Sequence, residues 1–214
     1  MPKLIIEGNR CLRGEINLQG AKNSILPILA AAILCEGESV IHNCPRLSDV
    51  DTTIKILNYL GCKVKFEGSD LTIDARNVDR DEIPGEFMRK MRSSIIFLGA
   101  LVSRLGSAKF SLPGGCELGP RPIDMHFSGM RQLGLTLKEK HGVIECNVGR
   151  GLVGCNIALS FPSVGATENL ILAAVKAKGT TTITNAAREP EIQDLAKYLN
   201  SCGAKIRGAG EGTI

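Results

Sequence analysis

The strongest constraint on the fold is an internal repeat, in which one order of elements occurs three times along the 214 residues. Each copy predicts an apolar helix, a glycine, a strand, a loop, an amphipathic helix and then a pair of strands. The glycine spacing supports this alignment, because Gly37 to Gly61 and Gly179 to Gly203 both span 24 positions. Gly106 to Gly134 spans 28 positions, so the second copy carries four additional residues.

The two helices of each copy differ in their pattern of apolar residues. Residues 25–34, 95–105 and 170–175 are apolar on nearly all sides, which is typical of buried helices. The second helices, near residues 50–57 and 192–199, have one apolar face only. The sequence therefore predicts an α/β fold of three pseudo-symmetric repeats, with buried helices inside and sheets and amphipathic helices outside.

Both ends of the chain depart from this repeat. Residues 3–7 and 12–18 predict a strand pair before the first helix that belongs to no complete copy. At the other end, Ile214 lies where the corresponding strand of the first copy is still running. We therefore expect a fragment of a longer polypeptide, with a three-repeat domain over 20–214 that is truncated at its C-terminal end.

Composition excludes several classes of function. Hydrophobic residues make up 43% and charged residues 22%, as in ordinary soluble proteins. The net charge of +4 comes from scattered side chains, which argues against a nucleic-acid partner. No apolar run reaches the roughly 18 residues of a membrane span, and no signal peptide is recognisable at the start. The eight cysteines form no CxxC pair, so we expect no metal and a reducing, cytoplasmic location.

The additional residues of the second copy fall in the loop 112–122, LPGGCELGPRP. Its three prolines and three glycines exclude regular structure. Gly114 and Gly115 allow close approach of a ligand to the backbone, and Cys116 follows them directly. An arbitrary Gly-Gly-Cys is more often a surface turn, but a loop lengthened in one copy of a repeat is a candidate for acquired function.

Polar residues precede the three buried helices at equivalent positions. Lys22-Asn23, Arg92 and Ser163-Val164 lie 14 to 16 residues before the glycine that follows each helix. Pseudo-symmetry predicts that these helix starts lie at one end of the domain, where free N–H groups favour phosphate or carboxylate. Arg121 and Asp124, beside the Cys116 loop, add a further cation and a possible hydroxyl-binding group. Capping and solvated charge are the structural alternatives, and the three histidines are expected to be structural or exposed.

With these residues in view, the chain resembles the UDP-N-acetylglucosamine 1-carboxyvinyltransferases, the MurA-type enolpyruvyl transferases. The resemblance is carried by stretches that occur in the family's order, namely GAKNSILPILAA (20–31), LSDVDT (47–52), MRSSI (91–95), LPGGCELGPRPIDMHFSG (112–129), SVGATEN (163–169) and NAAREPEI (185–192). It implies two inside-out α/β barrel domains of three repeats each, of which one is present here. It also implies that roughly residues 1–19 belong to the other domain.

The family reaction transfers the enolpyruvyl group of phosphoenolpyruvate to the 3-hydroxyl of UDP-N-acetylglucosamine and releases phosphate, without a cofactor. The resemblance implies that Cys116 is the general acid and that Lys22 and Arg121 hold phosphoenolpyruvate. It assigns further substrate contacts to Asn23, Arg92, Pro122, Ile123, Asp124, Met125, Ser163 and Val164. Because the family's catalytic aspartate and several arginines lie in the other half, this chain alone is expected to have no turnover.

Three alternatives remain open from the sequence. One is the related shikimate-pathway enolpyruvyl transferase, which lacks the LPGGC loop. Another is a ligand-binding or assembly half that must associate with a second polypeptide. The third is a structural repeat domain in which Cys116 has no role, so that Cys116→Ala would change nothing.

Overall fold

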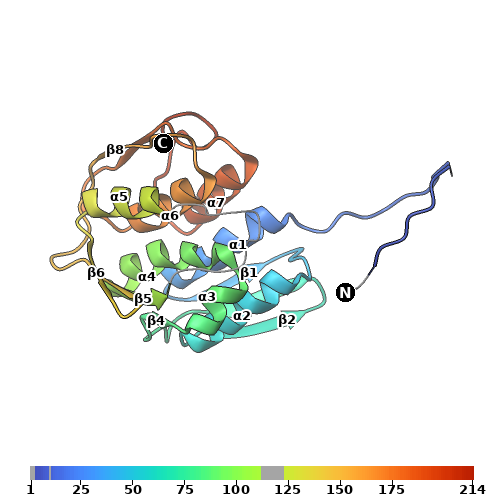
Figure 1. Cartoon of the computed structure of the whole chain (residues 1–214), viewed down its shortest axis with the longest axis horizontal. Helices are drawn as coiled ribbons and strands as arrows, with labels where there is room; N and C mark the ends of the chain where they lie inside the picture. Colours follow the sequence, from blue (N-terminus) through green and yellow to red (C-terminus); the bar gives the residue numbers. More distant parts are fainter. Residues whose placement is uncertain (1–2, 10, 112–122) are drawn as a thin grey trace.

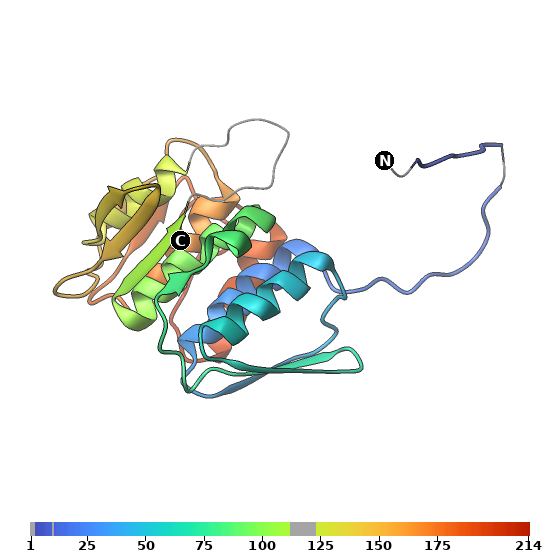
Figure 2. The ribbon, with the colours of Figure 1, turned by 60° about the horizontal axis from the view of Figure 1, so that its bottom comes forward.

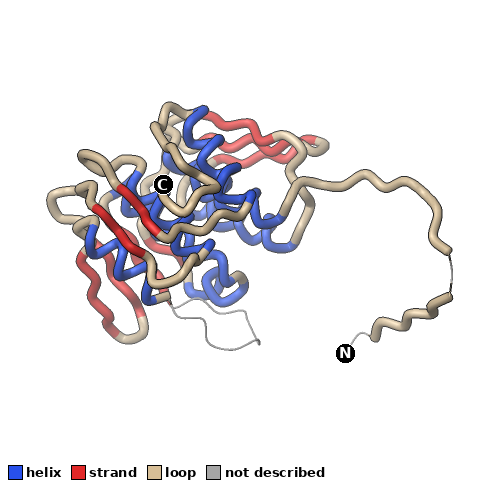
Figure 3. The backbone as a smooth tube through the Cα atoms, turned by 90° about the horizontal axis from the view of Figure 1, so that it is seen from above, coloured by secondary structure: helices blue, strands red, loops and turns tan. Residues whose placement is uncertain are grey.

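The computed structural model describes residues 3–9, 11–111 and 123–214, and for Arg92 it describes the backbone only. Helices lie in the centre of the molecule and separate small sheets lie around them (Figures 1 and 3). In those residues no helix is both long enough and apolar enough to cross a membrane.

The first unit contains a three-stranded antiparallel sheet with the order β1-β3-β2. Its elements are α1 (Lys22–Ala31), η1 (Ala32–Leu34), β1 (Glu38–Ile41), α2 (Ser48–Tyr59), β2 (Lys63–Glu67) and β3 (Asp70–Asp74). The hairpin strand β3 lies in the middle because its alternate residues Leu71 and Ile73 are fully buried against the helices.

The second unit repeats this arrangement, because β5-β7-β6 has the same order as β1-β3-β2. Its elements are β4 (Glu82–Ile83), α3 (Gly85–Lys90), η2 (Arg92–Ile96), α4 (Phe97–Leu105), β5 (Ser107–Ser111), α5 (Asp124–Gln132), β6 (Thr136–Lys140) and β7 (Val143–Asn147). The short strand β4, which the sequence pattern did not predict, adds to β5 in parallel.

The third unit is less regular than the sequence predicted. Its elements are β8 (Asn156–Ala158), α6 (Val164–Ala174), β9 (Thr182–Thr184) and α7 (Pro190–Ser201), with β8 parallel to β9. Instead of a strand pair after α7, a single bridge joins Thr184 to Thr213, beside reciprocal backbone hydrogen bonds between Ile183 and Ile214. Gly208 and Gly210 have positive φ and turn the chain here, which prevents continuous strand pairing.

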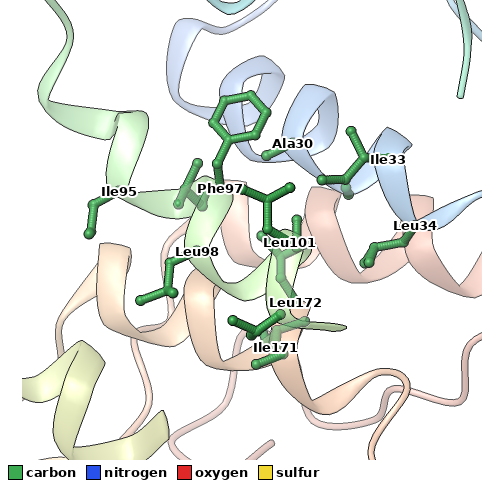
Figure 4. Close-up of a cluster of buried hydrophobic side chains, with 14 of the residues drawn as sticks. Ala30, Ile33, Leu34, Ile95, Phe97, Leu98, Leu101, Ile171 and Leu172 are labelled. Atoms are coloured by element: carbon green, nitrogen blue, oxygen red, sulfur yellow. The ribbon is translucent and has the colours of Figure 1, made fainter. Parts of the chain in front are cut away.

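The core lies where the buried helices of the three units meet. Figure 4 shows side chains of α1 and η1, of η2 and α4, and of α6 pointing toward one another. Leu29, Leu101 and Leu172, one from each unit, are completely buried. The predicted buried helices are therefore confirmed, and their apolar character on all sides follows from having neighbours on all sides.

One carboxylate joins the C-terminal ends of all three buried helices. Glu36 follows η1, and its Oε1 lies 2.7 Å from Nη1 of Arg104 on α4 and 3.1 Å from Nζ of Lys176 after α6. Since the cations come from the ends of the second and third helices, the three helices run in the same direction. Their N-terminal ends therefore also lie together.

The strand pair expected within residues 3–18 does not form. Residues 3–9 and 11–18 contain no strand and extend away from the folded part (Figures 1 and 2). Their large apolar side chains are exposed, with Leu12 at 92%. A strand needs a hydrogen-bonding neighbour and an apolar surface to cover, and this segment contacts neither among the described residues.

Candidate functional site

The starts of three helices meet around the first turn of α1. The Lys22 Nζ lies 2.5 Å from Asp49 Oδ2 at the start of α2. The Asn23 amide donates to Glu191 Oε1 of α7 at 3.4 Å, and Ser24 Oγ donates to Asp194 Oδ2 at 2.7 Å. The first turns of α1, α2 and α7 therefore share one end of the domain.

The starts of η2 and α6 lie at the same end. Asn169, in the second turn of α6, donates from Nδ2 to the Ile95 carbonyl of η2 at 2.9 Å. The Ala187 N–H, just before α7, donates to Thr167 Oγ1 of α6 at 3.1 Å. These contacts place the starts of α6, η2 and α7 level with one another, and the repeat predicted this for η2 and α6.

At the start of α6, Ser163 is the N-cap and its Oγ accepts from the Ala166 N–H at 3.4 Å. Val164 is the first residue of the helix and is half-buried. The structural reading of Ser163 as a cap is thus correct. It does not exclude ligand binding, because a hydroxyl that accepts one hydrogen bond can still donate another.

The residues just after the Cys116 loop form the first turn of α5. Ile123 is the N-cap, Asp124 is the first helical residue and is exposed, and Met125 is half-buried. The Met125 sulfur accepts from Ser160 Oγ at 3.3 Å, in the segment that leads into α6. This contact brings two sequence-predicted groups together, 123–125 and 163–164.

Four predicted site residues cannot be placed fully. Cys116, Arg121 and Pro122 lie outside the described residues. Arg92 opens η2, so its backbone lies at the expected helix start, and its side chain is not described.

A buried carboxylate that the sequence reading missed lies at this end. Glu168 on α6 is 7% exposed, and burial, followed by the nearby Glu191 and Glu189, raises its pKa to about 8. It is therefore protonated at neutral pH and is able to donate a hydrogen bond. The available signal was a glutamate near the start of a helix whose remaining residues are mostly apolar, which is rare without a specific role.

An open pocket of about 450 Å³ lies between the approach to α6 and the start of α7. It is lined by Pro162, Asn185, Ala186, Arg188 and Glu189. Arg188 adds a cation that the sequence reading did not select. Within the described part of the chain, no three His, Cys, Asp or Glu side chains are grouped as metal ligands.

Comparison with known proteins agrees with this architecture. The family model of EPSP synthase (3-phosphoshikimate 1-carboxyvinyltransferase) matches residues 6–214. UDP-N-acetylglucosamine 1-carboxyvinyltransferase 2 of Caldanaerobacter subterraneus is 56% identical over 100% of this chain and 51% of the relative. UDP-N-acetylglucosamine 1-carboxyvinyltransferase 1 of Symbiobacterium thermophilum is 51% identical over 97% of this chain and 48% of the relative. The chain thus spans about half the length of these curated relatives.

Solved structures share the fold. The enolpyruvyl transferase NikO from Streptomyces tendae superposes with a TM-score of 0.82 at 26% identity, covering 94% of this chain and 47% of NikO. EPSP synthase from Acinetobacter baumannii superposes with a TM-score of 0.70 at 18% identity, again over 94% of this chain and 47% of that structure. At that identity the likeness to EPSP synthase concerns the fold alone.

Proposed function

This chain belongs to the EPSP synthase family of carboxyvinyltransferases, and from that premise we propose that it is the N-terminal half of a UDP-N-acetylglucosamine 1-carboxyvinyltransferase. The full enzyme transfers the enolpyruvyl group of phosphoenolpyruvate to the sugar 3-hydroxyl, the first committed step of peptidoglycan synthesis. It works in the cytoplasm and serves cell shape and division. The relatives of 47% to 56% identity that carry this name support the assignment.

The observation that carries the proposal is the shared helix end. Lys22 and Asn23, the start of η2, and Ser163 all lie at this one end. Helix starts offer unpaired N–H groups, and an ammonium has three donors, so Lys22 can bind an anion while it contacts Asp49. Phosphoenolpyruvate and a nucleoside diphosphate are both polyanions, and a group of helix N-termini favours the binding of such anions.

The acidic side chains at this end make the cations essential. Asp49, Glu189 and Glu191 lie beside the helix starts, and a polyanionic substrate would be repelled by them without compensation. We assign this compensation to Lys22, Arg92 and Arg121. A protonated Glu168 adds no further negative charge.

The chemistry needs an acid and a closed site. Cys116 donates a proton to the methylene carbon of phosphoenolpyruvate, which makes C2 electrophilic, and the sugar 3-hydroxyl then adds to C2 while a base in the other half takes the hydroxyl proton. Loss of one proton from the resulting methyl group to the Cys116 thiolate, together with departure of phosphate from C2, restores the double bond and the thiol. Ile123, Asp124 and Met125, with Pro122, Ser163 and Val164, hold the sugar nucleotide.

The test is reconstitution. We expect this chain alone to release no phosphate from phosphoenolpyruvate and UDP-N-acetylglucosamine, and a mixture with the C-terminal half of the Caldanaerobacter relative to do so. Cys116→Ala is expected to lower this rate by about 100-fold or more, the usual contribution of a general acid. Fosfomycin, an epoxide that modifies the family's loop cysteine, should label Cys116 selectively among the eight thiols in the mixture.

The other outcomes separate the alternatives. Turnover by 1–214 alone would overturn the expectation of an inactive half. A folded mixture that binds UDP-N-acetylglucosamine without turnover would favour a binding or assembly role. Turnover with shikimate 3-phosphate in place of the sugar nucleotide would favour the shikimate-pathway enzyme.

A further inference from the structure

A completely buried amide joins three helices behind the proposed sugar-nucleotide site. Asn169 on α6 is 0% exposed. Its Oδ1 accepts from the Gly99 N–H of α4 at 2.6 Å, and its Nδ2 lies 2.9 Å from the Ile95 carbonyl oxygen. The same Nδ2 lies 2.9 Å from Nδ1 of His126 on α5, which is itself buried.

These contacts determine the tautomer of His126. A backbone N–H can only donate, so the Asn169 atom that faces Gly99 is the oxygen, and a carbonyl can only accept, so the atom that faces Ile95 is the nitrogen. The second N–H of this NH₂ group then points at His126. His126 Nδ1 must therefore be an unprotonated acceptor, and a neutral ring carries its proton on Nε2.

The His126 ring also lies beside the start of α6. A Cβ atom on Gly165 would lie 3.4 Å from Cε1 and 3.6 Å from Nε2 of the ring, which is ordinary van der Waals contact. Two positions earlier on α5 is Asp124, and directly before Gly165 are Ser163 and Val164. His126 thus lies between the two groups of residues that we assign to the sugar nucleotide.

We propose that His126, held as its Nε2–H tautomer by Asn169, is a positioning residue that fixes the first turn of α5 against the first turn of α6. This proposal rests on the proposed function, because those two turns are the ones assigned to UDP-N-acetylglucosamine. His126 acts through Asp124, Met125, Ser163 and Val164 and takes no part in proton transfer to substrate. Phosphoenolpyruvate, held mainly by Lys22 and Arg121, depends less on this alignment.

The first test is independent of activity. Long-range proton–nitrogen NMR spectra of the wild-type chain should show an unprotonated Nδ1 and a protonated Nε2 for His126. The chain has three histidines, and His126→Asn assigns the signals by removing one set. In Asn169→Asp the carboxylate cannot donate, so the His126 proton is expected to move to Nδ1. A protonated Nδ1 in the wild type would overturn the proposal.

The second test uses the reconstituted enzyme and three variants. His126→Leu, which has no acceptor, should raise the KM for UDP-N-acetylglucosamine about tenfold and change the KM for phosphoenolpyruvate by less than about twofold. His126→Asn places an amide oxygen near the position of Nδ1 and should restore the sugar-nucleotide KM to within about threefold of wild type. If His126→Leu does not fold, His126→Ala, which also has no acceptor, is compared with His126→Asn in its place.

Equal increases in both KM values, no increase, or failure of His126→Asn to restore binding would each overturn the positioning role. If the wild-type mixture has no turnover, the proposed function fails, and with it the role of His126 in that reaction. The NMR spectra of the His126 ring nitrogens still test the tautomer and its hydrogen bond to Asn169 in that case. Failure of the proposed function can therefore be distinguished from failure of the inference about His126.

Discussion

The backbone of Gly99 lies directly against the backbone of Asn169. A Cβ atom on Gly99 would lie 2.2 Å from the main-chain carbonyl oxygen of Asn169 and 2.5 Å from its side-chain Oδ1. Glycine therefore allows α4 and α6 to approach closely enough for the Gly99 N–H to reach that amide oxygen at 2.6 Å. This close approach sets the geometry of the central helix layer.

Gly99→Ala should destabilise the chain by about 2 to 3 kcal/mol, because the clash is with main-chain atoms that no rotamer change can relieve. Helix propensity alone would favour alanine, so the sign of the effect is diagnostic. Gly37→Ala is the matched control, since a Cβ there would meet no atom within 4 Å. Urea unfolding measures both, and equal stability of Gly99→Ala and wild type would contradict the close approach.

Glu168 should make stability depend on pH. Burial raises its pKa to about 8 from 4.5, so the folded state binds a proton that the unfolded state releases. The stabilisation is complete below pH 4.5, decreases as the pH rises toward 8 and is constant above it. Its full size is on the order of 5 kcal/mol at 1.36 kcal/mol for each pH unit.

Glu168→Gln should remove most of this dependence, so that the variant is more stable than wild type at pH 8.5 and differs little at pH 4.5. Urea unfolding at both pH values checks it. Glu145→Gln, an exposed position on β7, is the control and should leave the slope unchanged. A parallel pH dependence in wild type and Glu168→Gln would count against a protonated Glu168.

Thiol reactivity should follow burial. Burial raises the pKa of Cys62 and of Cys146 to about 12, and that of Cys44 to about 11. At pH 8 we expect iodoacetamide to modify the exposed Cys11 while these three buried thiols are still unmodified. Peptide mass mapping of samples taken at successive times measures this. Modification of Cys62 or Cys146 in the folded chain at the rate of Cys11 would show that this core opens readily.

The N-terminal segment should contribute nothing to the stability of the folded part. Leu12→Ser and Ile16→Ser replace side chains that are 92% and 84% exposed, so the free energy of unfolding in urea should change by less than about 0.5 kcal/mol. Leu29→Ser, a completely buried position, is the contrast and should prevent stable folding. A clear loss of stability in Leu12→Ser would show that this segment packs on the body in solution.

Lys22 should matter for activity and little for stability. Its ion pair with Asp49 is exposed, with 54% of the Lys22 side chain accessible, and such pairs contribute at most about 1 kcal/mol. In the reconstituted enzyme we expect Lys22→Ala to lower kcat/KM for phosphoenolpyruvate about 100-fold or more, because the substrate phosphate loses its contact with a full positive charge. Lys63→Ala, an exposed lysine on β2, should leave turnover unchanged. Full activity of Lys22→Ala would remove Lys22 from the site.

Long periodic patterns were sufficient to predict most of the elements. The buried helices were predicted because an apolar surface on every side of a helix has no other stable location. The sheet orders β1-β3-β2 and β5-β7-β6 follow the repeat that the glycine spacing indicated. The strands β4 and β8 were not predicted, because elements of two or three residues carry no measurable alternation and these two, unlike β9, have no place in the predicted repeat.

The site could be predicted only in part. Lys22, Asn23 and Ser163 were identifiable because they occupy equivalent positions before buried helices. Glu168 and the pairing of Asn169 with His126 could not be derived in the same way. The protonation of Glu168 and the tautomer of His126 depend on residues of neighbouring helices. Those residues are distant in the sequence, so the local pattern does not indicate them.

The sequence by itself determined the periodicity: which helices are buried, which are amphipathic and where the repeat is interrupted. These properties are local, because hydrophobic spacing and glycine conformations act within a few residues. Only the tertiary structure decided that Gly99, Asn169 and His126 form one hydrogen-bonded unit and that Glu168 retains its proton. Such properties arise from desolvation and from donors and acceptors on different helices, which exist only once the chain has packed.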